Sequence, residues 1–492
     1  MDLANALKIE NNATTTENGA FAYSSTLDSN LDFFNHISSF RLNPSACLSY
    51  FKKAFKEDKL LALKNLFYMR NIRGLGQGER EASRIIYKWL ALNHQTLMSL
   101  NIELIKEFGR VDDYYSLLKT SLEDKAFELL KNQIDKDLVS EHPSLTAKWL
   151  KSCNTYSKYS KRLGRITAKH FNMKEKEYRK MLATLRKKID VTEVKMCENN
   201  FKNIIYENVP SKAMFNYKEA FKYHDKKRFC DYLNKVTQNK VKINSATLYP
   251  YEIIAKYDLK RPSKFYVPHA YNKALECQWN ALPNYVNDSS STLVVADTSG
   301  SMVVGNAINV SLSLAIYFAR LNQGVWKDKM ITFSSNPHFI DFIGCVSLYD
   351  CLSMIPRINE NTDIEKVFDL ILNAAINNHV PAESMVKNII IISDMQFDIF
   401  DNKNQTSFTN FIKEKYQKAG YEMPCLIYWD VNKRSIPVSH ALNNDNNVKM
   451  ISGFSQSAFD AIIKSEAYDP KATMLDILNS KIFDKVRIWE LC

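Results

Sequence analysis

The sequence predicts a multidomain chain in which an all-α array of stacked helices is followed by an α/β doubly wound, Rossmann-like domain. Up to about residue 290, apolar residues recur at three- and four-residue steps, which is typical of helices with one buried face. Beyond that point, short β-branched runs alternate with helical segments, which indicates a parallel sheet covered on both faces. At 492 residues, the chain is long enough for two or three domains.

Residues 1–30 are expected to form a flexible tail, because they are rich in Asn, Thr and Ser and hold few large apolar side chains. Residues 31–290 then show one helical segment after another, without convincing strands. The helical spacing is clearest in residues 47–73, 79–109, 113–138, 176–189 and 228–240. This succession predicts a HEAT-like helical-repeat array, although no exact period is visible in the sequence.

The glycine-rich run GLGQGE, residues 74–79, is interpreted as a turn between two of these helices. It follows a helical segment instead of a strand, and it lacks the glycine and lysine spacing that places backbone amides around a phosphate. A nucleotide-binding loop is therefore not expected there.

Positive charge is concentrated in one part of the chain. Residues 148–242 contain 25 Lys and Arg against 9 Asp and Glu, whereas residues 1–147 contain 18 against 19 and residues 291–492 contain 18 against 22. Such asymmetry points to an acidic partner for the basic segment, with RNA or DNA first among the candidates. The alternative is a lysine-rich helical surface that is merely solvated.

Residues 291–492 are expected to form the α/β domain. Four runs are apolar on nearly every residue, as buried parallel strands are: STLVVAD, KMITFSS, KNIIIISD and PCLIYWD. Helical segments lie between them, at about residues 305–322, 362–380 and 406–420. Because ligands of doubly wound sheets bind at the carboxyl ends of the strands, polar residues at those ends are the candidate functional residues.

The first of these strands ends in the motif D-x-S-x-S, formed by Asp297, Ser299 and Ser301. A carboxylate with two nearby hydroxyls offers hard oxygen ligands, which suit Mg²⁺ or Mn²⁺ better than zinc or copper. Two other loops could complete the shell with Thr362 and with Asp394, which directly follows the most apolar strand. The alternative is that the serines only cap a helix.

In these residues the domain resembles the von Willebrand factor A domain, whose metal-ion-dependent adhesion site combines D-x-S-x-S with a later threonine and a later aspartate. The resemblance implies that Ser299, Ser301 and Thr362 contact the metal ion directly, and that Asp297 and Asp394 act largely through bound water. It also implies an open coordination position for a carboxylate of an acidic protein partner.

The layout of the whole chain is similar to that of the Ro autoantigen and its TROVE-domain relatives, in which a basic helical array precedes a von Willebrand factor A domain. The runs MRNIRGLGQGER, FGRVDDYYSLL, VPSKAMFNYKEAFKYHD and ISDMQFD resemble more closely an uncharacterised TROVE-like family of plants, fungi, bacteria and large DNA viruses. Ro proteins bind small structured RNAs on the outside of a helical ring and single-stranded ends in its central hole. The resemblance therefore implies RNA binding.

One stretch of the basic segment combines cations with aromatic residues, which can stack on bases while the cations neutralise phosphates. The candidate RNA-binding cations are Lys158, Lys161, Arg162, Arg165 and Lys169. The interleaved aromatic residues are Trp149, Tyr156, Tyr159 and Phe171, which could equally belong to a helix core. The leading hypothesis is a non-enzymatic RNA-binding protein, and the alternative is a protein-interaction scaffold that uses the metal site without nucleic acid.

Several other classes of protein are not expected. The run DTSGS lacks the glycine that the turn of an aspartic protease requires, and the nine histidines form no HxxxH or HExxH pair. No stretch of eighteen apolar residues occurs, and the amino terminus does not have the pattern of a signal peptide. Nine scattered cysteines without CxxC favour a reducing environment, so we expect an intracellular, cytoplasmic protein with no membrane partner.

Overall fold

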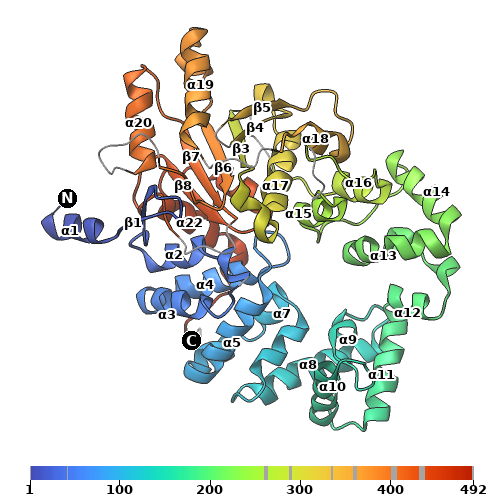
Figure 1. Cartoon of the computed structure of the whole chain (residues 1–492). Helices are drawn as coiled ribbons and strands as arrows, with labels where there is room; N and C mark the ends of the chain where they lie inside the picture. Colours follow the sequence, from blue (N-terminus) through green and yellow to red (C-terminus); the bar gives the residue numbers. More distant parts are fainter. Residues whose placement is uncertain are drawn as a thin grey trace.

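The computed structural model describes residues 2–41, 43–259, 264–286, 291–333, 336–357, 363–399, 407–431 and 438–489. Residues 29–280 form an arc of helices, named here the helical array, and residues 291–489 form the sheet domain (Figure 1). Both ends of the arc contact the sheet domain. At one end α2 (Ser29–Asn35) packs against β8 (Val448–Ser452), and at the other α15 (Pro250–Ile254) packs against α17 (Ala307–Leu321).

The other α-helices of the array follow one another in chain order, as the sequence predicts for residues 31–290. They are α3 (Cys47–Glu57), α4 (Lys59–Arg70), α5 (Arg80–Asn93), α6 (Gln95–Leu100), α7 (Leu104–Phe108), α8 (Glu123–Val139), α9 (Thr146–Trp149), α10 (Lys158–His170), α11 (Glu175–Lys188), α12 (Thr192–Cys197), α13 (Ser211–His224), α14 (Lys226–Thr237) and α16 (Lys273–Asn280). Local chemistry sets their ends. Asp58 ends α3 in an extended conformation, and its carboxylate caps α4 by accepting the Leu61 N–H at 2.9 Å.

The sheet has six strands in the order β5-β4-β3-β6-β7-β8. Their bounds are β3 (Thr292–Asp297), β4 (Lys329–Phe333), β5 (His338–Asp341), β6 (Asn388–Ser393), β7 (Cys425–Asp430) and β8. Val294 of β3 lies beside Met330 on one side and Ile390 on the other, so the first strand of the domain is central. Strand order reverses at the β3–β6 pair, which is the position where doubly wound sheets bind ligands.

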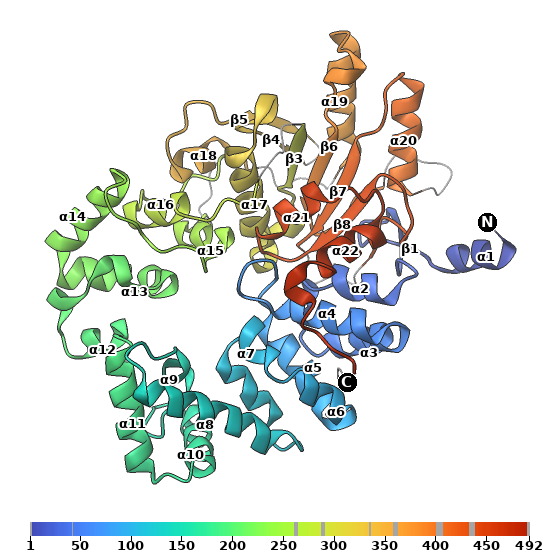
Figure 2. The same cartoon turned by 180° about the vertical axis from the view of Figure 1, so that it is seen from behind.

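The two faces of the sheet are covered by different helices because successive strand residues point to opposite sides. Val294 and Ala296 of β3 face α17, α21 (Ala458–Lys464) and α22 (Pro470–Leu478), which lie together in Figure 2. Leu293 and Val295 face the opposite side, where α19 (Glu365–Asn377) and α20 (Phe408–Lys418) pack. A further short helix, α18 (Leu348–Met354), contacts α16 of the array.

The core on the α17 side continues into the helical array without interruption. It joins the sheet residues to the buried faces of the array from α2 to α11 and of α15, and it also includes Phe215 of α13 and Leu275 and Trp279 of α16. Helices α12–α14 and α16 enclose a separate core, which includes Met214, Phe221 and Phe229. The sheet domain therefore shares one continuous hydrophobic core with the first half of the array.

The sequence-based description of the sheet is incomplete in two places. The structure adds β8, which runs parallel to β7, and β5, which runs antiparallel to β4 at the sheet edge and makes the sheet mixed instead of fully parallel. Strand β5 has four residues and is partly exposed, which leaves only a weak apolar signal. Strand β8 contains Lys449, whose buried ammonium group is bonded to the carbonyl oxygens of Ile462 and Ser465 at 3.0 and 2.6 Å.

The expectation of a flexible tail over residues 1–30 is wrong. Helix α1 (Leu3–Asn11) precedes a hairpin formed by β1 (Ala13–Thr15) and β2 (Phe21–Tyr23), named here the N-terminal hairpin. Tyr23 and Ser439 exchange two backbone hydrogen bonds of 2.8 Å. The hairpin is too short for a detectable apolar period, and its stability comes from residues that lie far away in the sequence.

The glycine-rich run 74–79 lies between α4 and α5 and joins the array to the sheet domain. The Gln77 side-chain oxygen accepts the Ser455 N–H at 3.3 Å, and the Gly76 N–H donates to the Ser457 hydroxyl at 3.3 Å. Tyr249, at the start of α15, donates to the Gln77 carbonyl at 3.2 Å. One loop thus contacts both the sheet domain and the far end of the arc.

None of the described helices combines the length and the apolar character that crossing a membrane requires.

Candidate metal centre and nucleic-acid interface

The structure brings four of the five predicted metal ligands to one place. Asp297 ends β3 and Asp394 follows β6, at the carboxyl ends of the two central parallel strands. Ser299 and Ser301 lie in the turn after β3, with their hydroxyl oxygens 3.1 Å apart. Thr362 falls in residues 358–362, outside the described part of the chain, so its place in the shell stays a prediction.

Hydrogen bonds connect these residues into one cluster. The Asp297 carboxylate accepts the Ser299 N–H at 2.9 Å and the Ser393 hydroxyl at 2.5 Å. Ser301 lies near enough to Asp394 for its hydroxyl to oppose, in part, the rise that burial causes in the pKa of Asp394. Ser299 precedes a short 3-10 helix (Gly300–Asn306) without capping it through its side chain, so the structure does not support the view that this serine is only a helix cap.

Burial gives the two carboxylates an unusual electrostatic environment. Burial raises the pKa of Asp297 to about 7, and repulsion by Asp394 adds to the effect. Burial also raises the pKa of Asp394. Within the described residues, neither carboxylate forms an ion pair with Lys, Arg or His. Two buried acids without a cation are costly to ionise, and a bound divalent cation would remove that cost.

The donor set fits Mg²⁺ or Mn²⁺. Two carboxylates and two hydroxyls are hard oxygen ligands, and the exposed Ser301 leaves the cluster open to solvent on one side. No group of three or more His, Cys, Asp or Glu side chains able to hold a metal ion occurs among the described residues. A site made only of His, Cys, Asp or Glu side chains differs from the Asp297 cluster, in which serine hydroxyls are two of the four candidate ligands.

Two residues near the cluster escaped the sequence analysis. Ser393 is the last residue of β6 and directly precedes the predicted ligand Asp394. A serine at the end of this strand is a local sequence signal from which its place in the cluster could have been predicted. Tyr266, from the segment after α15, is buried near Asp297. Burial, and to a smaller extent the negative charge of Asp297, raise the pKa of the Tyr266 hydroxyl to about 12. Its backbone N–H donates to the Ile355 carbonyl at 3.0 Å. Nothing in the local sequence indicates that Tyr266 lies near Asp297.

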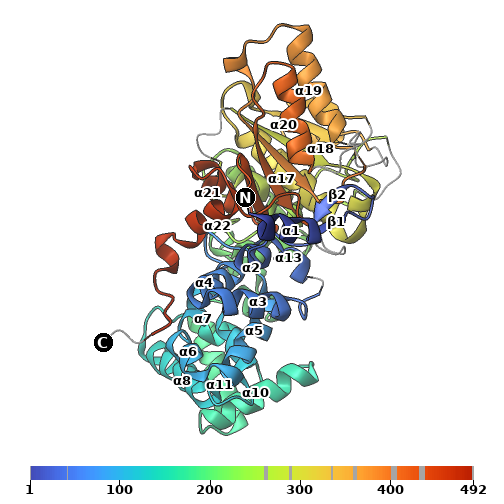
Figure 3. The same ribbon diagram turned by 90° about the vertical axis from the view of Figure 1, so that its left-hand side faces the viewer.

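The predicted RNA-binding cations lie on α10, at the end of the molecule opposite to α19 (Figure 3). Lys158, Arg162, Arg165 and Lys169 are exposed, and Lys161 is half-buried. Arg165 forms an ion pair of 3.0 Å with the partly exposed Glu175. In the part of the chain that the structure describes, the other four cations form no ion pair.

The aromatic residues of this stretch divide into two groups. Tyr156 and Tyr159, at the start of α10, are 104% and 68% exposed. Phe171 is buried, and Trp149 is half-buried beneath the Arg110 guanidinium group, which lies 4.2 Å from the ring centre. Only the two tyrosines are therefore available to stack on a base.

Comparison with known families adds an identification. Residues 16–142 and 144–292 match the family described as Domain of unknown function (DUF2828). The chain belongs to the DUF2828 family. Residues 291–484 match a second family, described as Domain of unknown function (DUF7788). The DUF2828 match ends and the second match begins at residues 291–292, beside the predicted domain boundary between residues 290 and 291.

This DUF2828 protein is also similar to a viral protein, "Uncharacterized protein L728" of Acanthamoeba polyphaga mimivirus. The two are 27% identical over 525 residues, which cover 97% of this chain and 89% of the viral protein. Neither the two family descriptions nor the viral name carries a function. The resemblance to Ro proteins and to von Willebrand factor A domains therefore stays an expectation.

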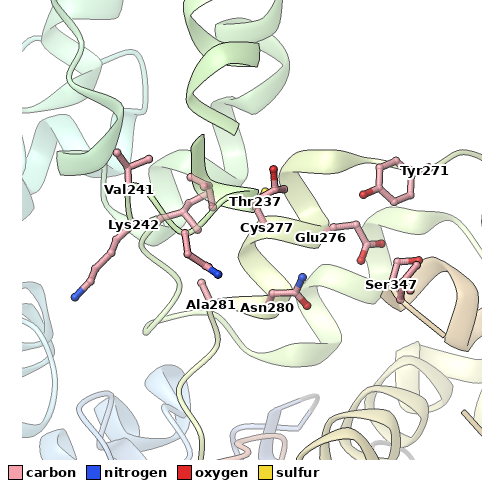
Figure 4. Close-up of a pocket in the computed structure, with 13 residues that line it drawn as sticks. Thr237, Val241, Lys242, Tyr271, Glu276, Cys277, Asn280, Ala281 and Ser347 are labelled. Carbon is pink, nitrogen blue, oxygen red and sulfur yellow. The ribbon is translucent and has the colours of Figure 1, made fainter. Parts of the chain in front are cut away.

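The DUF2828 region also contains a pocket of about 610 Å³ at its border with the sheet domain (Figure 4). Thr237, Lys242, Asn280 and Ser347 are among the side chains that line it. Glu276, in its wall, is buried and accepts the Leu348 and Tyr349 N–H groups at 2.8 and 3.1 Å. This carboxylate holds the first turn of α18, so its role is to join the two parts of the chain.

Proposed function

We propose that this protein is a non-enzymatic RNA-binding protein whose basic helical array binds RNA. Its sheet domain, in this proposal, is a von Willebrand factor A-like domain that uses Mg²⁺ or Mn²⁺ to capture an acidic residue of a protein partner. The observation that carries the proposal is the surface of α10, where four cations that pair with no acidic side chain among the described residues lie next to two exposed tyrosines. Cations can neutralise phosphates there, and the tyrosine rings can stack on unpaired bases.

The arrangement of the array supports a TROVE-like, HEAT-like architecture. Its two ends both pack on the sheet domain, through α2 and α15, as a ring closed by that domain requires. The order of strands in the sheet, counted along the chain, is 3-2-1-4-5-6, and the D-x-S-x-S cluster lies at the point where this order reverses. Both features agree with the resemblance to Ro proteins.

The RNA-binding proposal is tested by reversing charge on α10. Lys158, Lys161, Arg162 and Arg165 are changed together to Glu, and RNA affinity is measured by filter binding at three salt concentrations. We expect weaker binding of many RNAs at once, because contacts to the phosphate backbone do not read bases. The matched control changes four exposed lysines outside the basic segment to Glu: Lys53, Lys56, Lys88 and Lys413.

If the α10 variant binds RNA as the wild type does, or if the wild type binds no RNA at low salt, the basic segment is only a solvated surface. The alternative function would then apply, in which the protein is an interaction scaffold that uses its metal centre without nucleic acid. The two buried carboxylates of that centre, which have no cationic partner in the described part of the chain, are the observation that favours this alternative.

A further inference from the structure

The turn of the N-terminal hairpin lies against the loop that follows Asp394. The Thr16 hydroxyl donates to the Phe397 carbonyl at 2.7 Å, and the Glu17 N–H donates to the Gln396 side-chain oxygen at 2.7 Å. The Asn18 side chain donates to the Gln396 carbonyl at 2.7 Å. Three consecutive residues of the turn thus bind two consecutive residues of the loop.

The turn itself is firmly built. Thr16 is buried, and its hydroxyl also accepts the Ala20 N–H at 2.9 Å. Gly19 has a φ of +90° and pairs with Asp398, and a Cβ atom at this position would lie 3.1 Å from the Ile399 side chain. The backbone of Glu17 is therefore held in one place relative to the metal centre.

Gln396 links Glu17 directly to the metal centre. Its side-chain oxygen accepts the Glu17 N–H, and its own backbone N–H donates to the Asp394 carboxylate at 3.2 Å. The Glu17 side chain is exposed, and Asp297 belongs to the same cluster as Asp394. Three carboxylates would repel one another in this arrangement, whereas a divalent ion between them would attract all three.

A buried hydrogen-bond donor beside Glu17 also supports a position of the Glu17 carboxylate at the cluster. The Gln396 side chain is 2% exposed, and its Nε2 atom has no hydrogen-bond partner among the described residues. Because the Oε1 atom of the same amide accepts the Glu17 N–H, this unused donor lies next to Glu17. A buried donor without a hydrogen-bond partner lowers the stability of the folded protein. When the Glu17 carboxylate turns towards the cluster, it can accept a hydrogen bond from this Nε2 atom.

We propose that Glu17 is an internal ligand of the metal centre, whose carboxylate fills the coordination position otherwise open to a partner. The inference rests on the proposed metal centre and deepens it, because it adds a ligand from the N-terminal hairpin. An acidic partner must then displace Glu17 before it can bind. The open position is protected from weak carboxylate ligands, and only a partner with further contacts can compete.

The test compares wild type with Glu17→Gln in the full chain, with Mn²⁺ as the probe. Calorimetry measures Mn²⁺ affinity, and water-proton relaxation measures how many water molecules the bound ion retains. For the variant we expect Mn²⁺ affinity several-fold weaker and roughly one additional bound water, since a Gln amide is a poorer ligand than a carboxylate. The matched control is Glu10→Gln, an exposed carboxylate of α1 in the same N-terminal segment.

A second measurement uses the tripeptide acetyl-Gly-Glu-Gly-amide, with acetyl-Gly-Gln-Gly-amide as its control. In the presence of Mn²⁺ we expect the Glu17→Gln variant to bind the acidic peptide more tightly than wild type does. The Glu17 N–H bond to Gln396 does not depend on the side chain of residue 17, so the hairpin should stay folded, and thermal unfolding verifies it.

The two proposals fail in different ways. If wild type binds no Mn²⁺, or if Asp297→Ala binds Mn²⁺ as wild type does, the metal centre itself is wrong. If wild type binds Mn²⁺ through Asp297, but Glu17→Gln retains the same affinity, the same number of bound waters and the same peptide binding, then only the internal ligand is wrong.

Discussion

The hydroxyl of Ser393 donates a hydrogen bond of 2.5 Å to the buried carboxylate of Asp297. These are the last residues of β6 and β3, so the bond links the two central strands at the edge where the candidate ligands gather. It also orients the Asp297 carboxylate, whose other oxygen accepts the Ser299 N–H. The cluster is thus arranged by its own hydrogen bonds, and a metal ion would enter a site whose first ligand already has a defined orientation.

Replacing Asp297 by Ala should abolish Mn²⁺ binding while the domain stays folded. The change removes a buried carboxylate that is costly to ionise, but it leaves the Ser393 hydroxyl and the Ser299 N–H without their acceptor, at about 1–3 kcal/mol each. We therefore expect a modest loss of stability in thermal unfolding and no heat of Mn²⁺ binding in calorimetry. Undiminished Mn²⁺ binding in this variant would place the metal site elsewhere.

Mn²⁺ affinity should depend on pH through Asp297. Burial, with repulsion from Asp394, raises the pKa of this carboxyl to about 7, so protons compete with the metal ion below that pH. Affinity should rise with pH up to about 7, by roughly tenfold per unit for one proton released, and level off above it. A calorimetric series from pH 5 to pH 8 measures this, and a flat profile would contradict the assignment.

The same shift predicts how stability without metal depends on pH. The folded state holds the Asp297 proton more tightly than the unfolded chain, in which the pKa is near 3.8. The contribution of this group to stability should therefore be greatest below pH 4 and decrease as the pH rises to about 7. Mn²⁺ should consequently raise the melting temperature more at pH 8 than at pH 5, which a thermal shift assay can measure. Equal shifts at both pH values would argue against coupling through Asp297.

Tyr156→Ala and Tyr159→Ala should weaken the binding of single-stranded RNA, by about 1–3 kcal/mol for each base that stacks. Their exposure of 104% and 68% means that the folded state loses little packing. Filter binding of an unstructured RNA measures the effect. Tyr468→Ala in the sheet domain is the matched control, because that side chain is 66% exposed and lies outside the basic segment. If all three variants weaken RNA binding equally, base stacking on the α10 tyrosines does not contribute to RNA binding.

Gly453→Ala should destabilise the junction between the array and the sheet domain. Gly453 has a φ of +120°, and an added Cβ atom would lie 2.0 Å from the Gln77 side-chain oxygen. We expect a loss of about 1–3 kcal/mol from overpacking, in addition to backbone strain. Gly344→Ala is the control, because its φ is +89° and no atom lies within 4 Å. Urea denaturation measures both, and equal losses would show that the Gln77 contact is unimportant.

Features that depend on neighbouring residues along the chain could be predicted from the sequence. The apolar runs of β3 and β6, the helical periods of α3–α5 and the D-x-S-x-S turn are all local. Because parallel strands of a doubly wound sheet end at one edge, the meeting of Asp297 and Asp394 followed from the fold class alone. The charge of α10 was equally visible, since exposure of lysine and arginine needs no tertiary contact.

Only the tertiary structure decided the features that depend on distant residues. The N-terminal hairpin is held by residues 396–398 and 439, and β8 carries a lysine whose amine finds its carbonyl partners in and after α21. Tyr266 is brought near Asp297 from the segment between α15 and α16. The burial of Phe171 and the exposure of Tyr156 were likewise set by packing, because a sequence shows which side chains are aromatic but not which neighbours cover them.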